Sequence, residues 1–156
     1  MTSKIYNIES LRFVCDSVRK KSKIVFTNGC FDLLHVGHIR YLQEARSLGD
    51  FLVVGVNSDA SVKTLNKGPD RPVQVEQDRA EILAALECVN AVCIFNEPTP
   101  LKLIENVKPN FLVKGGDWDV SKIVGADFVI KNGGQVKALP FVPGRSTSDI
   151  IKKINS

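Results

Sequence analysis

Short apolar runs that end in glycine or small polar residues recur along the chain, and a segment of helical period lies between one run and the next. Residues 24–27 form such a run and are closed by Asn28-Gly29, and residues 111–113 form another, closed by Lys114-Gly115. A continuous apolar run of this length is typical of a strand buried on both faces of a parallel sheet. Further apolar runs occupy residues 51–56, 91–95, 128–130 and 136–139.

Between these runs the apolar residues recur every three or four positions, which predicts helices. The predicted helices cover residues 8–21, 36–48, 75–86, 99–107 and 146–154. In the last of them Ile150, Ile151 and Ile154 are expected to face inward. Alternation of strands and helices predicts an α/β fold, a parallel sheet of about five strands with helices on both faces and right-handed crossovers.

The length of 156 residues suits one Rossmann-like domain over residues 1–156, with an N-terminal helix at about 8–21 and the α/β core at about 23–154. A net charge of +4 without a long basic run argues against nucleic-acid binding. No apolar run is long enough for a membrane span, and the first ten residues do not resemble a signal peptide, so a cytoplasmic protein is expected. The four cysteines show no zinc-type spacing, and reduced thiols explain them.

The junction after the first predicted strand contains both histidines of the chain, His35 and His38. A strand that runs into small residues and then a helix start presents backbone N–H groups to a phosphate. Two imidazoles three residues apart share a side of the helix and can donate to the same phosphate oxygens. Gly37 between them would let a nucleotide approach the backbone closely. By spacing alone, the pair could also be inert surface residues, whereas a zinc site would lack its third and fourth ligands.

Several motifs, in this order, resemble those of the cytidylyltransferase-like nucleotidyltransferases, whose signature is HxGH. The matching stretches are residues 28–32, His35-Val36-Gly37-His38, residues 56–59, Lys67-Gly68, residues 71–73, Asp78-Arg79, residues 112–117 and residues 144–148. The likeness runs from about residue 23 to residue 154. Within the family it is greatest to the domain that makes ADP-heptose from D-glycero-β-D-manno-heptose 1-phosphate and ATP.

The resemblance implies a role for each matched residue. His35, His38 and Lys67 would be catalytic: the imidazoles would stabilise the pentavalent transition state at the α-phosphorus, and the lysine would reach the phosphates from a mobile loop. The nucleotide would be bound by Asn28, Gly29, Cys30, Phe31, Asp32, Gly37, Lys114, Gly115, Asp117, Ser146, Thr147 and Ser148. The sugar phosphate would be bound by Asn57, Asp59, Arg71, Arg79 and Arg145.

Some of these roles have local alternatives. Asp32 could orient Mg²⁺ through water or cap its own turn. Arg79 could form a structural salt bridge instead of binding substrate. Trp118 could wall the site or simply pack. Cys30 is not expected to act as a nucleophile, because no third histidine is available to activate it.

The reaction implied is transfer of AMP from ATP to the heptose 1-phosphate, with release of pyrophosphate, for lipopolysaccharide core assembly. Mg²⁺ is expected to accompany ATP without ligands from the protein. The resemblance also implies a homodimer and, because a fused sugar kinase would not fit in this length, a separate kinase acting upstream.

Two other functions remain open from the sequence. One is a cytidylyltransferase acting on a polyol or amino-alcohol phosphate such as glycerol 3-phosphate, and the other is a nucleotide-binding module without catalysis. That cytidylyltransferase branch has RTEGIST, and its arginine falls on Phe141 here, which favours adenine over cytosine. A dehydrogenase is disfavoured, since no GxGxxG follows the first strand.

Overall fold

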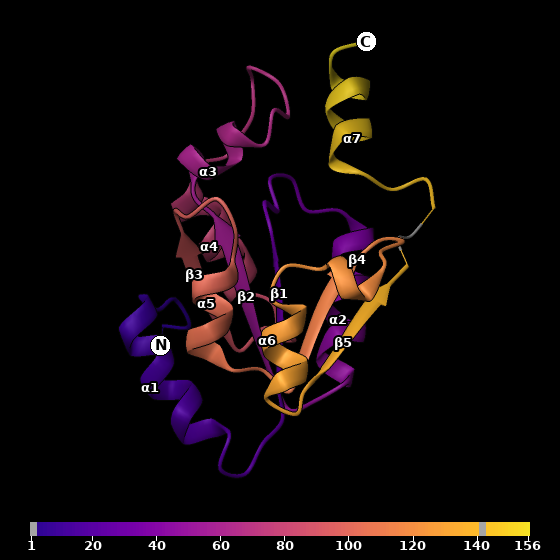
Figure 1. Ribbon diagram of the computed structural model, residues 1–156. Helices are drawn as coiled ribbons and strands as arrows, with labels where there is room; N and C mark the ends of the chain where they lie inside the picture. The colour runs from indigo at the N-terminus through magenta and orange to yellow at the C-terminus, as the bar shows by residue number, and fades with distance from the viewer. Residues whose placement is uncertain (1–2, 141–142) are drawn as a thin grey trace.

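The computed structural model describes residues 3–140 and 143–156, and its centre is a sheet of five parallel strands (Figure 1). The strand order is β3-β2-β1-β4-β5. Their bounds are β1 Ile24–Gly29, β2 Phe51–Asn57, β3 Ala91–Phe95, β4 Phe111–Gly115 and β5 Gln135–Leu139. The predicted α/β class and the number of strands are confirmed. Because all strands run in one direction, their carboxyl ends meet at one edge of the sheet, where loops can assemble a site.

Helices cover both faces of the sheet, as the alternation of elements predicts. On one face α1 (Ile8–Val18), α5 (Leu101–Val107) and α6 (Ala126–Lys131) share a core with Phe26 and Val53. On the other face α2 (Val36–Ser47) and α4 (Glu76–Ala84) share a core with Val25 and Val54. Neighbouring residues of β1 and β2 thus enter opposite cores, as the two-residue period of a strand requires.

Two of the strands continue beyond their apolar runs. Asn28 and Gly29, expected after the first strand, are its last residues and pair with Gly55 and Val56. Lys114 and Gly115 likewise extend β4 and pair with β5. Ladder hydrogen bonds therefore fix the backbone of these polar residues, which lie at the edge where ligands are expected to bind.

Helix ends were the weakest part of the prediction. The first helix stops at Val18 instead of residue 21, and the guanidinium of Arg19, its C-cap residue, donates to the Val107 carbonyl. The helix predicted over residues 75–86 is α4, shorter by one residue at its start and two at its end. The run at residues 128–130 lies within α6, and α3 (Asp59–Thr64), which Ser58 caps, has no counterpart in the prediction.

The last helix, α7 (Thr147–Ile154), begins where predicted, with Ser146 as its N-cap. The expectation that its isoleucines face inward is wrong for Ile154, which is 72% exposed, whereas Ile150 and Ile151 are half-buried and no residue of the helix is fully buried. Figure 1 shows the reason, because α7 extends beyond the carboxyl edge of the sheet and so lies outside both cores. In the part of the chain that the structure describes, no helix combines the length and apolar character needed to cross a membrane.

Candidate active site

A cleft of about 700 Å³ opens at the carboxyl ends of β1 and β4. Its wall is formed by the β1–α2 junction, the segment of residues 67–71, the end of β4 and the start of α7. Most of the predicted site residues line it: Asn28, Gly29, Cys30, Phe31, Asp32, His35, Gly37, His38, Lys67, Arg71, Lys114, Gly115, Arg145, Ser146, Thr147 and Ser148. A volume of this size is normal for a nucleotide-sized ligand.

The two histidines are locked together at the start of α2. His35 is the N-cap residue, and its Nδ1 accepts the Gly37 N–H at 3.0 Å. The Nδ1 of His38 accepts the backbone N–H of His35 at 3.3 Å, which completes a capping box. Their ring centroids lie 3.9 Å apart. Since both Nδ1 atoms act as acceptors, each neutral ring carries its proton on Nε2, and two N–H donors remain for a ligand in the cleft.

Glycine at position 37 is required by this arrangement. A Cβ placed on Gly37 would lie 2.7 Å from the imidazole Cε1 of His35, so any side chain there would displace the capping ring. The sequence predicted that this glycine lets a nucleotide approach the backbone. The structure adds a second reason: because Gly37 has no side chain, the His35 ring can fold back over the first turn of α2.

Phe31 supports His38 from the turn after β1. Its backbone adopts φ 49°, in the left-handed region that non-glycine residues seldom occupy. Its buried ring lies 5.5 Å from the His38 ring, centroid to centroid, and fills the space where a Gly29 side chain would stand. The turn thus fixes the position of the second imidazole.

The surroundings keep both rings neutral near pH 7. Burial, followed by the neighbouring His35 and Lys67, lowers the pKa of His38 to about 4. Burial and then Arg145 lower the pKa of His35. Burial also raises the pKa of the Cys30 thiol, which disfavours the thiolate that a nucleophile would need.

Positive groups converge on the cleft from residues 67–71, the end of β4 and the start of α7. The cations that line it are Lys67, Arg71, Lys114 and Arg145. The N-terminus of α7 adds backbone N–H groups, and Thr147 fixes this terminus by donating its hydroxyl to the Leu33 carbonyl at 2.8 Å. Cations and helix N-termini together favour a polyanion such as a triphosphate.

Asp32 anchors one wall of the cleft. Its carboxylate accepts the Nε–H of Arg71 at 2.7 Å, the N–H of Val73 at 2.8 Å and the N–H of Gln74 at 2.9 Å. Although burial opposes ionisation, these hydrogen bonds outweigh it and lower the pKa of Asp32. The carboxylate neither caps its own turn nor remains free for a metal ion, and its partners lie about forty residues away along the chain.

We expect Asp32→Asn to loosen the segment of residues 71–74. An amide cannot accept all three hydrogen bonds or pair with Arg71, so the free energy of unfolding should fall by about 1–3 kcal/mol in urea titrations. Because the folded pKa of Asp32 is lowered, this contribution is present above the unfolded value of about 4 and is lost as pH falls through the folded pKa. The stability gap between the wild type and the variant should therefore be constant from pH 5 to 8 and narrow in acid. The exposed Asp70→Asn is the matched control, and an equal loss there would contradict the assignment.

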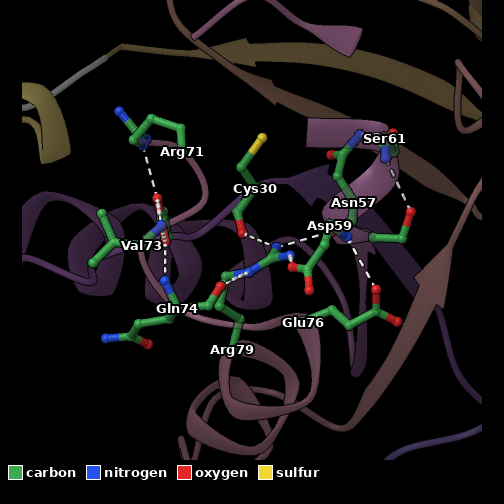
Figure 2. A network of polar contacts seen from close by, with 11 residues as sticks. Cys30, Asn57, Asp59, Ser61, Arg71, Val73, Gln74, Glu76 and Arg79 are labelled. Carbon is green, nitrogen blue, oxygen red and sulfur yellow. Dashed lines mark hydrogen bonds and ion pairs between the residues drawn. The ribbon is translucent and has the colours of Figure 1, made fainter. Parts of the chain in front are cut away.

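Arg79, predicted to bind substrate, is instead a buried structural residue (Figure 2). Its Nη1 donates to the carbonyls of Cys30 at 2.7 Å and Asn57 at 2.8 Å, its Nε donates to Gln74, and its Nη2 pairs with Asp59 at 2.8 Å. All three nitrogens of the guanidinium donate to protein acceptors, and the side chain does not line the cleft, which supports the structural alternative for this arginine.

Three further predicted residues lie away from the cleft lining. Asn57 is buried and donates to the Ser61 hydroxyl, and Asp59 accepts from Arg79. Asp117 is exposed beyond the end of β4 and is not part of the cleft wall. Phe141, on which the comparison with RTEGIST rests, lies outside the described residues.

Several residues of the cleft wall were not predicted: Tyr41, Pro143, Gly144 and Asp149. For Tyr41 a signal existed, because it lies three residues after His38 and therefore on the same side of α2. Its hydroxyl is 2.6 Å from that of Thr27 on β1. Pro143 and Gly144 lie in the irregular segment before α7, where no periodicity indicates a direction, and Asp149 lies in the first turn of α7.

Residues 26–153 match the model of the family described as cytidylyltransferase-like. The bifunctional protein HldE of Syntrophotalea carbinolica is 56% identical over 97% of this chain, and HldE of Geotalea uraniireducens is 54% identical over 99%. The chain spans only 31% of the length of each of these relatives.

Solved structures also resemble this chain. A lipopolysaccharide core biosynthesis protein from Thermoplasma volcanium is 31% identical, with a TM-score of 0.63 over 78% of this chain and 97% of that one. Pantoate-beta-alanine ligase from Francisella tularensis, 21% identical with a TM-score of 0.65 over 94% of this chain and 69% of that one, shares the fold. The family match over most of the chain and the HxGH cleft agree, and the chain belongs to the cytidylyltransferase-like nucleotidyltransferase family.

Proposed function

We propose that this protein transfers AMP from ATP to a sugar 1-phosphate, D-glycero-β-D-manno-heptose 1-phosphate, and releases pyrophosphate. The observation that carries the proposal is the locked pair His35 and His38, which leaves two neutral Nε2–H donors in a cleft that four cationic side chains also line. Such a site is suited to stabilise the charge that develops on a phosphate.

In the proposed reaction an oxygen of the sugar phosphate attacks the α-phosphorus of ATP, and the bond between that phosphorus and the bridging oxygen breaks. His35 and His38 donate to the α-phosphate oxygens as negative charge accumulates. Lys67 and the N-terminus of α7 stabilise the charge of the leaving pyrophosphate. No protein nucleophile is needed, since positioning and electrostatics supply the catalysis.

A second, smaller hollow of about 300 Å³ gives room for the acceptor. It lies between the segment of residues 67–71 and α7, and it shares Lys67, Arg71 and Ser148 with the cleft. Lys152 adds another cation to its wall. An anionic sugar next to a bound triphosphate fits these surroundings.

Mg²⁺ is proposed to enter as part of the ATP complex, where it shields the charge of adjacent phosphates. Among the residues that the structure describes, no group of three or more His, Cys, Asp or Glu could ligate a metal ion, and the carboxylate of Asp32 is already engaged. In this proposal the protein's own contribution is the set of donors and cations that bind the phosphates.

The choice of heptose rests on the sequence motifs and on the relatives. A protein whose description is lipopolysaccharide core biosynthesis aligns over almost its full length, and the HldE proteins match nearly every part of this chain. The acceptor must already carry a phosphate on its anomeric carbon, so a sugar kinase reaction has to precede this one. The homodimer and the cytoplasmic location expected from the sequence belong to the same proposal, and light scattering after gel filtration would measure the first.

The test follows pyrophosphate release with purified protein, MgCl₂ and either ATP or CTP, each offered heptose 1-phosphate or glycerol 3-phosphate. We expect turnover with ATP and heptose 1-phosphate at a rate at least tenfold above the other three pairs. Brisk turnover with CTP and glycerol 3-phosphate would replace the proposed substrates with those of a cytidylyltransferase. ATP binding without pyrophosphate release from any acceptor would identify a non-catalytic nucleotide-binding module.

A further inference from the structure

An anchored and half-exposed indole forms part of the cleft wall. Trp118 follows β4, lines the cleft and is 47% exposed. Its Nε1 donates to the carbonyl of Gly115 at 3.1 Å, and the ammonium of Lys114 lies 5.1 Å from the ring centroid. These two contacts come from the adjoining end of β4, so the ring is oriented without being covered.

Packing does not explain this position. In the described part of the chain Trp118 belongs to neither of the two hydrophobic clusters that cover the sheet. An aromatic side chain of this size contributes to stability mainly by burial, and about half of that contribution is missing here. A flat apolar surface that is held in place and left open to a cleft is suited to a flat ligand.

The phosphate-binding groups leave one region of the cleft for such a ligand. His35, His38 and the N-terminus of α7 supply donors for phosphates, and the hollow suited to the sugar phosphate opens between residues 67–71 and α7. Trp118 borders the cleft but not that hollow. On the side of β4 the cleft wall combines the indole with the bare backbone of Gly115, which lets a planar group come close.

We propose that Trp118 is the surface on which the nucleotide base stacks, and that its area favours a purine over a pyrimidine. The inference rests on the proposed function only in that a nucleotide occupies the cleft. Stacking of a base on an aromatic side chain contributes enough that its loss weakens binding by about tenfold or more. A bicyclic purine covers more of an indole than a single pyrimidine ring does, so the preference for ATP over CTP should depend on Trp118.

The chain contains one tryptophan, and its fluorescence therefore reports on this residue alone. Titration with ATP or AMP should quench the emission saturably, whereas tripolyphosphate should bind without comparable quenching. By calorimetry Trp118→Ala should raise the Kd for ATP at least tenfold and reduce the ratio of ATP to CTP affinity. The Kd of Trp118→Phe for ATP should lie between those of Trp118→Ala and the wild type. Phe13→Ala is the matched control, because Phe13 is an aromatic residue of α1 that is 79% exposed and lies outside the cleft.

Several results would overturn the inference. ATP that binds by calorimetry without changing the emission, and with equal Kd in Trp118→Ala, would contradict it and leave the proposed reaction intact. Quenching by heptose 1-phosphate alone, but not by AMP, would assign the indole to the sugar. Absence of any nucleotide binding would also exclude a stacking role for Trp118. Conversely, quenching by ATP with no turnover of any sugar phosphate would support the stacking role and refute only the proposed reaction.

Discussion

Replacing His38 with alanine should lower kcat for pyrophosphate release by at least about 100-fold, the scale seen when one transition-state donor is removed. His38 lines the cleft, and the capping box directs its Nδ1 to the backbone of His35, which leaves Nε2–H for the reacting phosphate. The loss should appear in kcat more than in KM for ATP, because the donor acts most strongly on charge that exists only in the transition state.

Two conservative variants separate the cap from the catalytic donor. In His38→Asn the amide group can still accept the His35 N–H, but no group remains at the position of Nε2. In His38→Gln the amide nitrogen can reach that position, but the same amide then no longer turns its oxygen toward the His35 N–H, so donation to the phosphate competes with the cap. We expect His38→Asn to be stable and slow, and His38→Gln to be less stable, by about 1 kcal/mol, but faster. The reverse order of rates, or near-normal turnover in His38→Asn, would refute the catalytic role.

The pH profile adds an independent check on the same residue. Because the pKa of His38 is lowered to about 4, the free enzyme has a neutral ring throughout the range from pH 6 to 8. No inflection in kcat/KM over this range should come from His38, since kcat/KM reports the free enzyme and substrate. ATP has an ionisation of its own nearby, so the comparison is between the wild type and His38→Asn. An inflection present only in the wild type would contradict a neutral donor.

The sequence predicts those parts of the fold that depend on residues close together along the chain. The apolar runs of β1, β2 and β3 and the periodic face of α2 are local patterns, and an alternating order of such elements leaves few topologies. The histidine junction was also recognisable, because a strand, two imidazoles and a helix start follow one another within about fifteen residues.

The roles of Asp32 and Arg79 could not be obtained in this way. Asp32 meets Arg71 across 39 positions of the chain, and Arg79 meets Cys30 across 49, so no periodicity relates them. A charged residue inside a matched motif is easily assigned to a ligand, and only burial shows that the guanidinium of Arg79 serves the protein itself. The apolar face of α7 correctly predicts a helix, but amphipathicity does not show what covers that face.

The buried guanidinium of Arg79 should be the most important single polar group for stability. It connects the turn after β1, the end of β2 and the start of α4 through hydrogen bonds to three backbone carbonyls and one carboxylate. Backbone carbonyls cannot be removed by mutation, so truncating the arginine leaves them buried and unpaired. We expect Arg79→Ala to lower the free energy of unfolding by about 3–5 kcal/mol.

Graded variants test whether the backbone bonds or the ion pair matter more. Asp59→Asn removes the charge of a carboxylate that is 32% exposed, and it should cost no more than about 1 kcal/mol. Arg79→Lys keeps a charge but cannot reach all four acceptors, so it should lie between Asp59→Asn and Arg79→Ala. Urea unfolding of the four proteins measures this order. A loss below about 1 kcal/mol in Arg79→Ala would show that water satisfies the carbonyls, and the arginine would then be free for a role in binding.

Because Cys30 lies in the turn that leads to His35, a stability loss of the expected size should also slow catalysis at temperatures where the variant is still folded.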